Sequence, residues 1–205
     1  MLSIETTPGA LRRRARILAG ATIGWNVIEA VVAIGAGVTA GSVALVGFGI
    51  DSTIEVSASI SVLWLLAGRH DERRERQTSR AIAVSFAALA LYVAVEAVIS
   101  LASGDRPHHS TVGIVLAALS LLVMPGLAFA KRATGRTMGS GSVVADGTQT
   151  LLCSNLSAAL LIGLVLNTSF GWWWADPLTG LFIAFVAARE ARETCTIDRL
   201  SWVLP

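Results

Sequence analysis

Two pairs of polar residues, each four positions apart, stand inside long apolar stretches of this sequence. Asp51 and Glu55 form one pair, and Gln149 and Cys153 form the other. Residues four apart share one face of a helix. Two carboxylates at that spacing repel each other unless a proton or a cation lies between them, and a thiolate is a strong metal ligand. This pattern predicts that the carboxylates share a proton or a cation.

Three further ionisable residues interrupt the apolar stretches: Asp146, Glu29 and Glu96. An ionisable group in hydrocarbon costs on the order of 3 kcal/mol or more, so each one indicates a function or a partner. We interpret Asp146 as an entry ligand or proton acceptor of the same site, with a helix-end contact as the alternative. For Glu29 and Glu96 we favour a role in packing or in a proton pathway over direct ligation of a metal.

The elements that must position these residues are six apolar runs. Of the 205 residues 54% are apolar and only 15% are charged, whereas soluble domains carry about a quarter charged residues. A helix needs roughly 20 apolar residues to cross a bilayer. The sequence therefore predicts an all-α, polytopic integral membrane protein with six transmembrane helices. The runs lie at about 17–37, 43–66, 81–102, 111–130, 143–166 and 172–188.

Basic residues set the orientation. Of the 16 Lys and Arg residues, only Arg106 falls in a connector on the side opposite the termini. Positive charge stays in the cytoplasm, so both ends and the charged connectors 68–80 and 131–141 are expected there, in a plasma or inner membrane. This distribution explains the basic pI of 8.9 without nucleic acid as a partner. We expect a cytoplasmic segment 1–16, a transmembrane domain 17–188 and a short cytoplasmic tail 189–205.

The estimated depth of each pair in the bilayer places the two pairs at similar levels. At about 1.5 Å rise per residue, Asp51 and Glu55 lie roughly 12 and 18 Å below the outer edge of the bilayer. Gln149 and Cys153 lie roughly 9 and 15 Å above the inner edge of a core about 30 Å thick. Antiparallel packing of the second and fifth spans would therefore gather four ligands near the midplane.

Small residues and caps should support this packing. Gly49 and Gly147, next to the two pairs, are expected to let the second and fifth spans approach closely. Asp176 before Pro177 is expected to cap the start of the sixth span. Three positions also align between the two halves, too few to establish a repeat: Gly49, Asp51 and Glu55 with Gly147, Gln149 and Cys153.

From Asn26 to about Arg189 the sequence resembles the transmembrane part of the cation diffusion facilitator family. The residues that carry the likeness are Asn26–Glu29, Gly41–Leu45, Tyr92–Ala97, Ala145–Gly147 and Ala175–Leu178. The family exchanges divalent metal ions, often zinc, for protons. Many members also have a cytoplasmic domain that binds metal and helps the protein to dimerise. The 205 residues hold no such domain, so any homodimer is expected to form through the membrane helices.

The resemblance implies a metal site made of two residues from the second span and two from the fifth. Carried over, these are Asp51, Glu55, Gln149 and Cys153, although the family usually has His at Gln149 and Asp at Glu55 and Cys153. A Gln oxygen replaces imidazole poorly for zinc, whereas a thiolate favours soft ions. Each residue has a plainer alternative: hydrogen bonds between helices for the carboxylates and Gln149, and packing for Cys153.

We therefore expect a secondary transporter that exports Zn²⁺ or another soft or borderline divalent cation in exchange for protons. The metal would be a substrate rather than a permanent cofactor, and the partners would be lipid, metal ions and protons. The alternative is a membrane metal-binding sensor or partner subunit that does not transport. Enzyme motifs are missing from the sequence, so it is not expected to be an enzyme. His70 and Asp71 form a weak candidate for a second site, with a solvated charged face as the alternative.

Overall fold

The computed structural model describes residues 7–67, 72–104 and 106–200. These residues form six helices, which confirms the all-α fold. Five of them are long and apolar enough to cross a membrane, and the sixth carries charged residues from Arg189 onward. The helices are α1 (Pro8–Ala40), α2 (Val43–Ala67), α3 (Glu72–Ser103), α4 (Thr111–Met138), α5 (Gly141–Phe170) and α6 (Ala175–Leu200).

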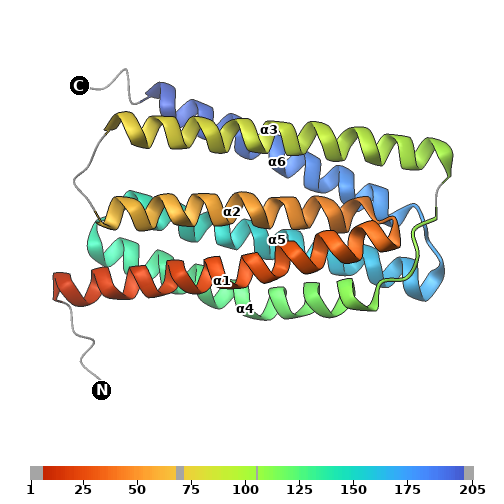
Figure 1. The fold of residues 1–205 in the computed structure, drawn as a ribbon, viewed down its shortest axis with the longest axis horizontal. Coiled ribbons are helices and arrows are strands. Elements are labelled where there is room, and N and C mark those ends of the chain that lie inside the picture. The colour runs from red at the N-terminus through yellow and green to blue at the C-terminus, as the bar shows by residue number, and fades with distance from the viewer. Residues whose placement is uncertain (1–6, 68–71, 105, 201–205) are drawn as a thin grey trace.

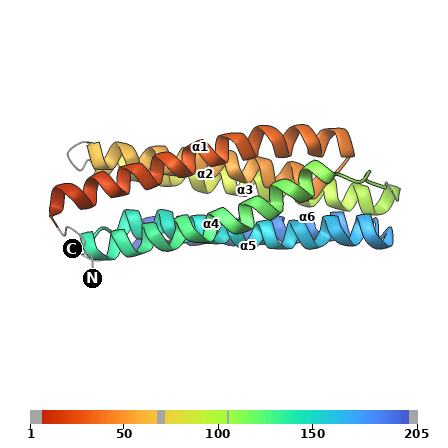
Figure 2. The ribbon, with the colours of Figure 1, turned by 90° about the horizontal axis from the view of Figure 1, so that it is seen from below.

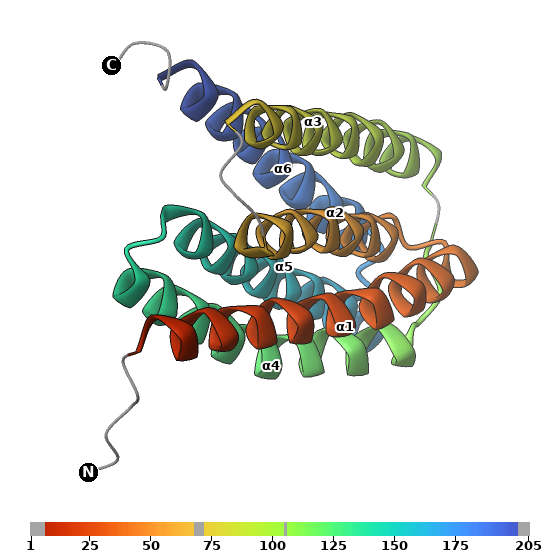
Figure 3. The same cartoon turned by 60° about the vertical axis from the view of Figure 1, so that its left-hand side comes forward.

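The helices form two layers of three. Figure 2 shows α1, α2 and α3 in one layer and α4, α5 and α6 in the other. Across the layers α1 packs on α4, α2 on α5 and α3 on α6, as Figure 3 shows. Helix α2 also contacts α1, α3 and α6, and 61% of its apolar window is buried, against 28–44% in the other four candidate spans. The helix with the carboxylate pair is therefore the central one.

The two halves of the chain repeat each other in inverted orientation. The turn between α1 and α2 and the turn between α4 and α5 lie at opposite ends of the bundle, and α1 begins where α6 ends (Figure 1). Both turns close on a left-handed glycine, Gly41 and Gly139, each with φ of 65°. In both, the residue after this glycine donates its N–H to the carbonyl of another glycine five residues before it, over 2.9 Å. Corresponding residues differ in number by 98.

Close glycine contacts follow the same offset and correct one expectation. A Cβ on Gly49 would lie 3.0 Å from the backbone nitrogen of Ile34, and a Cβ on Gly147 would lie 2.9 Å from that of Arg132. These glycines therefore bring α1 onto α2 and α4 onto α5. The prediction that they bring α2 onto α5 was wrong, because sequence spacing does not show which neighbour a small residue faces.

The helices extend well beyond the apolar runs, which corrects the predicted connectors. Helix α3 already begins at Glu72, and only Gly139 and Ser140 separate α4 from α5. Lys131, which was placed in a charged connector, lies inside α4 with 1% of its surface exposed. Charged residues can continue a helix past the hydrocarbon edge, and a buried Lys can stay in the bundle when it has a partner.

Asp176 stabilises a different helix from the one predicted. It lies inside the first turn of α6, and its carboxylate accepts hydrogen bonds from the Ser42 hydroxyl and from the N–H of Val43 at 3.0 Å and of Ala44 at 3.5 Å. It therefore satisfies free N–H groups at the start of α2, where negative charge is favoured. This contact ties the beginning of α6 to the beginning of α2.

We expect Asp176→Ala to lower the stability of the folded protein by about 1 kcal/mol or more, the usual cost of a lost helix cap. Thermal unfolding of purified protein, followed by tryptophan fluorescence, measures the change. Asp176→Asn keeps an acceptor oxygen and should lose less. Ser42→Ala should add little to Asp176→Ala, because both remove the same contact. Fully additive losses would show that Asp176 does not act through the start of α2.

Candidate metal centre

Asp51 and Glu55 are carried by the central helix α2 and are 6% and 1% exposed. They lie one helical turn apart on the face that α2 turns toward α5 and α6. Within the described residues, no hydrogen bond or ion pair reaches Asp51, and neither carboxylate oxygen of Glu55 has a hydrogen-bond partner. Polar groups of Asn26, Thr150 and Cys153 lie close to Glu55 without meeting hydrogen-bond geometry.

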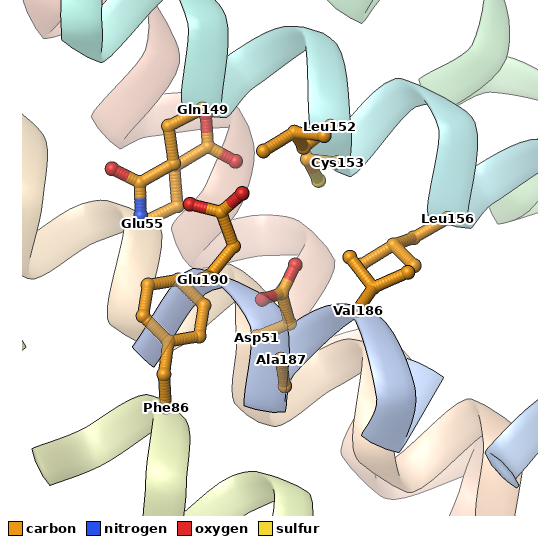
Figure 4. A pocket seen from close by; sticks show the side chains of 10 residues that line it. All are labelled: Asp51, Glu55, Phe86, Gln149, Leu152, Cys153, Leu156, Val186, Ala187 and Glu190. Atoms are coloured by element: carbon orange, nitrogen blue, oxygen red, sulfur yellow. The ribbon is translucent and has the colours of Figure 1, made fainter. Parts of the chain in front are cut away.

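Gln149 and Cys153 of α5 face the same carboxylates across a small cavity. Figure 4 shows the four side chains around it. Its volume of about 10 Å³ is close to the minimum that holds one water molecule, which also suits a single ion. The complete lining consists of Asp51, Glu55, Phe86, Gln149, Leu152, Cys153, Leu156, Val186, Ala187 and Glu190. The structure therefore brings together all four residues selected from the sequence.

Unsatisfied polar atoms concentrate at this cavity. Besides the two oxygens of Glu55, the amide nitrogen of Gln149 is buried without a partner, and so are both polar atoms of the Asn26 amide on α1. Buried polar atoms nearly always have partners, and an unpaired buried carboxylate is especially costly. This set of atoms can bind a proton, a water molecule or a cation.

The side chains do not yet surround an ion. Across the described ranges, no three His, Cys, Asp or Glu side chains converge closely enough to hold a metal. The four candidates instead line opposite walls of the cavity.

Glu29 lies outside the cavity lining, and each of its carboxylate oxygens accepts a hydrogen bond from a serine hydroxyl. It accepts hydrogen bonds from Ser52 at 2.8 Å and from Ser120, and Trp25 donates to Ser120 at 3.1 Å. The Cys153 thiol is 3.9 Å from a Glu29 oxygen, within reach of a weak hydrogen bond. Glu29 therefore lies next to one candidate ligand without lining the cavity itself.

Asp146 forms a buried ion pair. Its carboxylate is 2.8 Å from the ammonium of Lys131 and accepts a hydrogen bond from Ser59 at 2.9 Å. Lys131 also donates to the Thr150 hydroxyl at 3.1 Å. These contacts join α2, α4 and α5 at a level closer to the termini than the Glu55 carboxylate. Asp146 does not line the cavity.

The other predicted positions lie elsewhere. Glu96 is half-buried on α3 and does not line the cavity, and His70 and Asp71 fall outside the described residues. Sequence reasoning missed three polar groups at or near the site: Glu190, which it counted with the charged tail, Lys131, which it counted with a connector, and Asn26. The Asn26 signal was present, since an Asn inside an apolar run needs a partner as an acid does.

The cation efflux transmembrane domain matches residues 21–197, most of the chain and all six helices. The cation-efflux pump FieF of Shewanella oneidensis is 30% identical over 84 residues, which are 41% of this chain and 28% of the pump. The aligned part thus spans less than a third of that relative. On the extent of the domain match, the chain belongs to the cation diffusion facilitator family, as its sequence motifs predicted.

Proposed function

We propose that this protein exports a divalent metal cation from the cytoplasm in exchange for protons, and that Asp51, Glu55, Gln149 and Cys153 hold the cation. One observation carries the proposal: the Glu55 carboxylate is 1% exposed, has no hydrogen-bond partner and lines a cavity with the other three. Helices in lipid do not retain such a group without a use for it. A binding site for a cation is the use that best fits these residue types.

Exchange follows from competition for the same atoms. Carboxyl and thiol groups in a low-dielectric cavity hold their protons unless a cation is present. Each O–H or S–H group that becomes a metal ligand gives up its proton, so metal binding releases protons and protonation releases metal. If the cavity opens alternately to the two sides of the membrane, the inward proton gradient drives the metal outward.

The inverted repeat supports alternating access. The cavity lies where α2 of the first repeat meets α5 of the second, and inverted repeats commonly place a transport site at such an interface. The buried pair Lys131–Asp146 joins the same two helices through Ser59 and Thr150 nearer the termini. We infer that this pair closes the cytoplasmic side of the cavity in the conformation described.

Orientation and assembly belong to the same proposal. The basic residues at the end of the bundle where α1 begins favour cytoplasmic termini in a cell membrane. Large apolar side chains on the outer faces of α1, α3 and α4 suit lipid and a second copy of the chain, and we propose a homodimer through these helices. A membrane sensor or partner subunit would use the same cavity without net transport.

Asp51→Asn should abolish transport while the protein still inserts and folds. Asn keeps the shape of Asp but removes an anionic ligand and a proton carrier. Metal-dependent proton movement in vesicles that contain only the purified protein is the measurement. Glu193→Gln, at an exposed position on α6, is the matched control. Transport at the wild-type rate in Asp51→Asn vesicles would reject the site, and a wild-type protein that binds metal without moving it would indicate a sensor.

Single-cysteine reporters should confirm the orientation. In a Cys153→Ser, Cys195→Ser background, Arg136→Cys should react with a membrane-impermeant thiol reagent only from the cytoplasmic side. His109→Cys should react only from the other side, because both positions are exposed and lie at opposite ends of the bundle. Labelling of the Arg136→Cys protein from outside intact cells would overturn the charge-based orientation.

Cys153→Ala should weaken Zn²⁺ and Cd²⁺ binding by about tenfold or more and weaken Mn²⁺ binding far less. The expectation follows because thiolates prefer soft ions and loss of groups at metal sites costs 10–100-fold. Cys153→Asp, which restores the usual residue of the family, should shift preference toward harder ions. Calorimetry on purified protein across the three metals makes the comparison. An equal loss for all metals, or none, would show that Cys153 only packs.

A further inference from the structure

Glu190 is the one carboxylate at the cavity that comes from α6. It lines the same cavity as Asp51 and Glu55, and Figure 4 shows its carboxylate projecting toward the space between theirs. Ala187, one turn earlier, is buried and lines the cavity too, whereas the adjacent Arg189 is exposed. Glu190 therefore lies on the inward face of α6.

The depth of Glu190 follows from the contact between the starts of α2 and α6. Asp176 is bonded to the N–H of Val43, so both helices start at the same level and run the same way. Glu55 lies 12 residues beyond Val43, and Glu190 lies 14 residues beyond Asp176. At 1.5 Å per residue these are rises of about 18 and 21 Å. The two carboxylates therefore stand at nearly the same height in the bundle.

The basic residue next to Glu190 is engaged elsewhere. Arg189 donates from Nε to Glu193 Oε1 over 2.6 Å on the exposed face of α6. Within the described residues no hydrogen bond or ion pair ties Glu190 down. The half-buried Glu190 carboxylate is therefore held near two other carboxylates, an arrangement that costs energy unless a proton or cation is shared among them.

A second, independent observation points to a ligand in the space between these carboxylates. Both oxygens of the fully buried Glu55 face the cavity without a partner, and the buried amide nitrogen of Gln149 is unpaired as well. Glu190 reaches the same cavity from the third wall, opposite α2 and α5.

We propose that Glu190 is a fifth ligand of the transported cation and its third carboxylate, an inference that rests on the function proposed above. Three carboxylate oxygens, an amide oxygen and one sulfur exceed the four donors of a tetrahedral zinc site. A third carboxylate favours ions that accept more oxygen ligands, such as Mn²⁺ or Co²⁺, and offsets the preference for soft ions that Cys153 introduces. Through Glu190, α6 would contact the bound cation together with α2 and α5.

Cobalt provides the direct test, because four-coordinate tetrahedral Co²⁺ absorbs visible light much more strongly than five-coordinate Co²⁺ and geometry is diagnostic of the ligand set. We expect full-length Glu190→Ala protein, which has no donor atom at this position, to absorb more strongly than the wild type when loaded with Co²⁺. Its Mn²⁺ affinity should fall about tenfold or more, and its Cd²⁺ affinity should fall less. Glu193→Ala, the matched control at an exposed position that does not line the cavity, should change both properties far less.

Glu190→Asp keeps the charge on a shorter side chain and should lie between the wild type and Glu190→Ala, which tests the proposal even if Glu190→Ala folds poorly. Spectra and affinities of both Glu190 variants equal to those of the wild type would overturn the proposal. Asp51→Asn separates this failure from failure of the site itself. If Asp51→Asn loses Co²⁺ binding while the Glu190 variants do not, the four-residue site stands and Glu190 is not a ligand. If Asp51→Asn also binds Co²⁺ normally, the proposed function loses its site.

Discussion

The cost of placing charged side chains in an apolar bundle governs this structure. Most of its buried charges have been given partners: Glu29 has hydroxyl groups, Asp146 has the Lys131 ammonium and Asp176 has the N–H groups at the start of α2. Each of these contacts joins different helices, so the charges hold the bundle together while they are neutralised. Asp51 and Glu55 are the exception among the described residues, since they are buried without hydrogen bonds. The energetic cost of burying them would be offset only by a bound proton or cation, which is why we propose that the cavity is a binding site.

The fold places that exception at the centre of the bundle, where the proposed transport function needs it. Helix α2 is central, and its carboxylates face α5 and α6 rather than lipid. The inverted repeat places Gln149 and Cys153 on α5 at the positions that correspond to Asp51 and Glu55 on α2. Each pair is therefore supported by the same kind of packing: Gly49 lies closely against α1, and Gly147 lies closely against α4. Two helix hairpins of opposite orientation meet at the cavity, which is the arrangement that the proposed alternating access requires.

Much of this could be predicted from the sequence, and the exceptions have physical causes. Hydrophobic runs and basic residues define the spans, and the cost of acids in hydrocarbon identifies Asp51 and Glu55. The partners of Asp176 and Lys131 could not be predicted, because each depends on which helix ends meet in three dimensions. Glu190 was missed because a carboxylate beside two arginines and another glutamate reads as part of a solvated tail. The repeat was hidden because few of its positions keep the same residue type, although turn glycines and backbone contacts repeat with a constant offset of 98.

The central claim is that a divalent cation binds between α2 and α5 at the cavity lined by Asp51, Glu55, Gln149 and Cys153. Crystals of the full-length protein grown with Cd²⁺ would test it most directly, because cadmium scatters anomalously and its position can be found without assumptions about ligands. The account predicts an anomalous peak inside this cavity, with Cys153 Sγ and carboxylate oxygens of Asp51 and Glu55 at bonding distance. Cadmium bound only outside the cavity, with Asp51 and Glu55 uncoordinated, would contradict it.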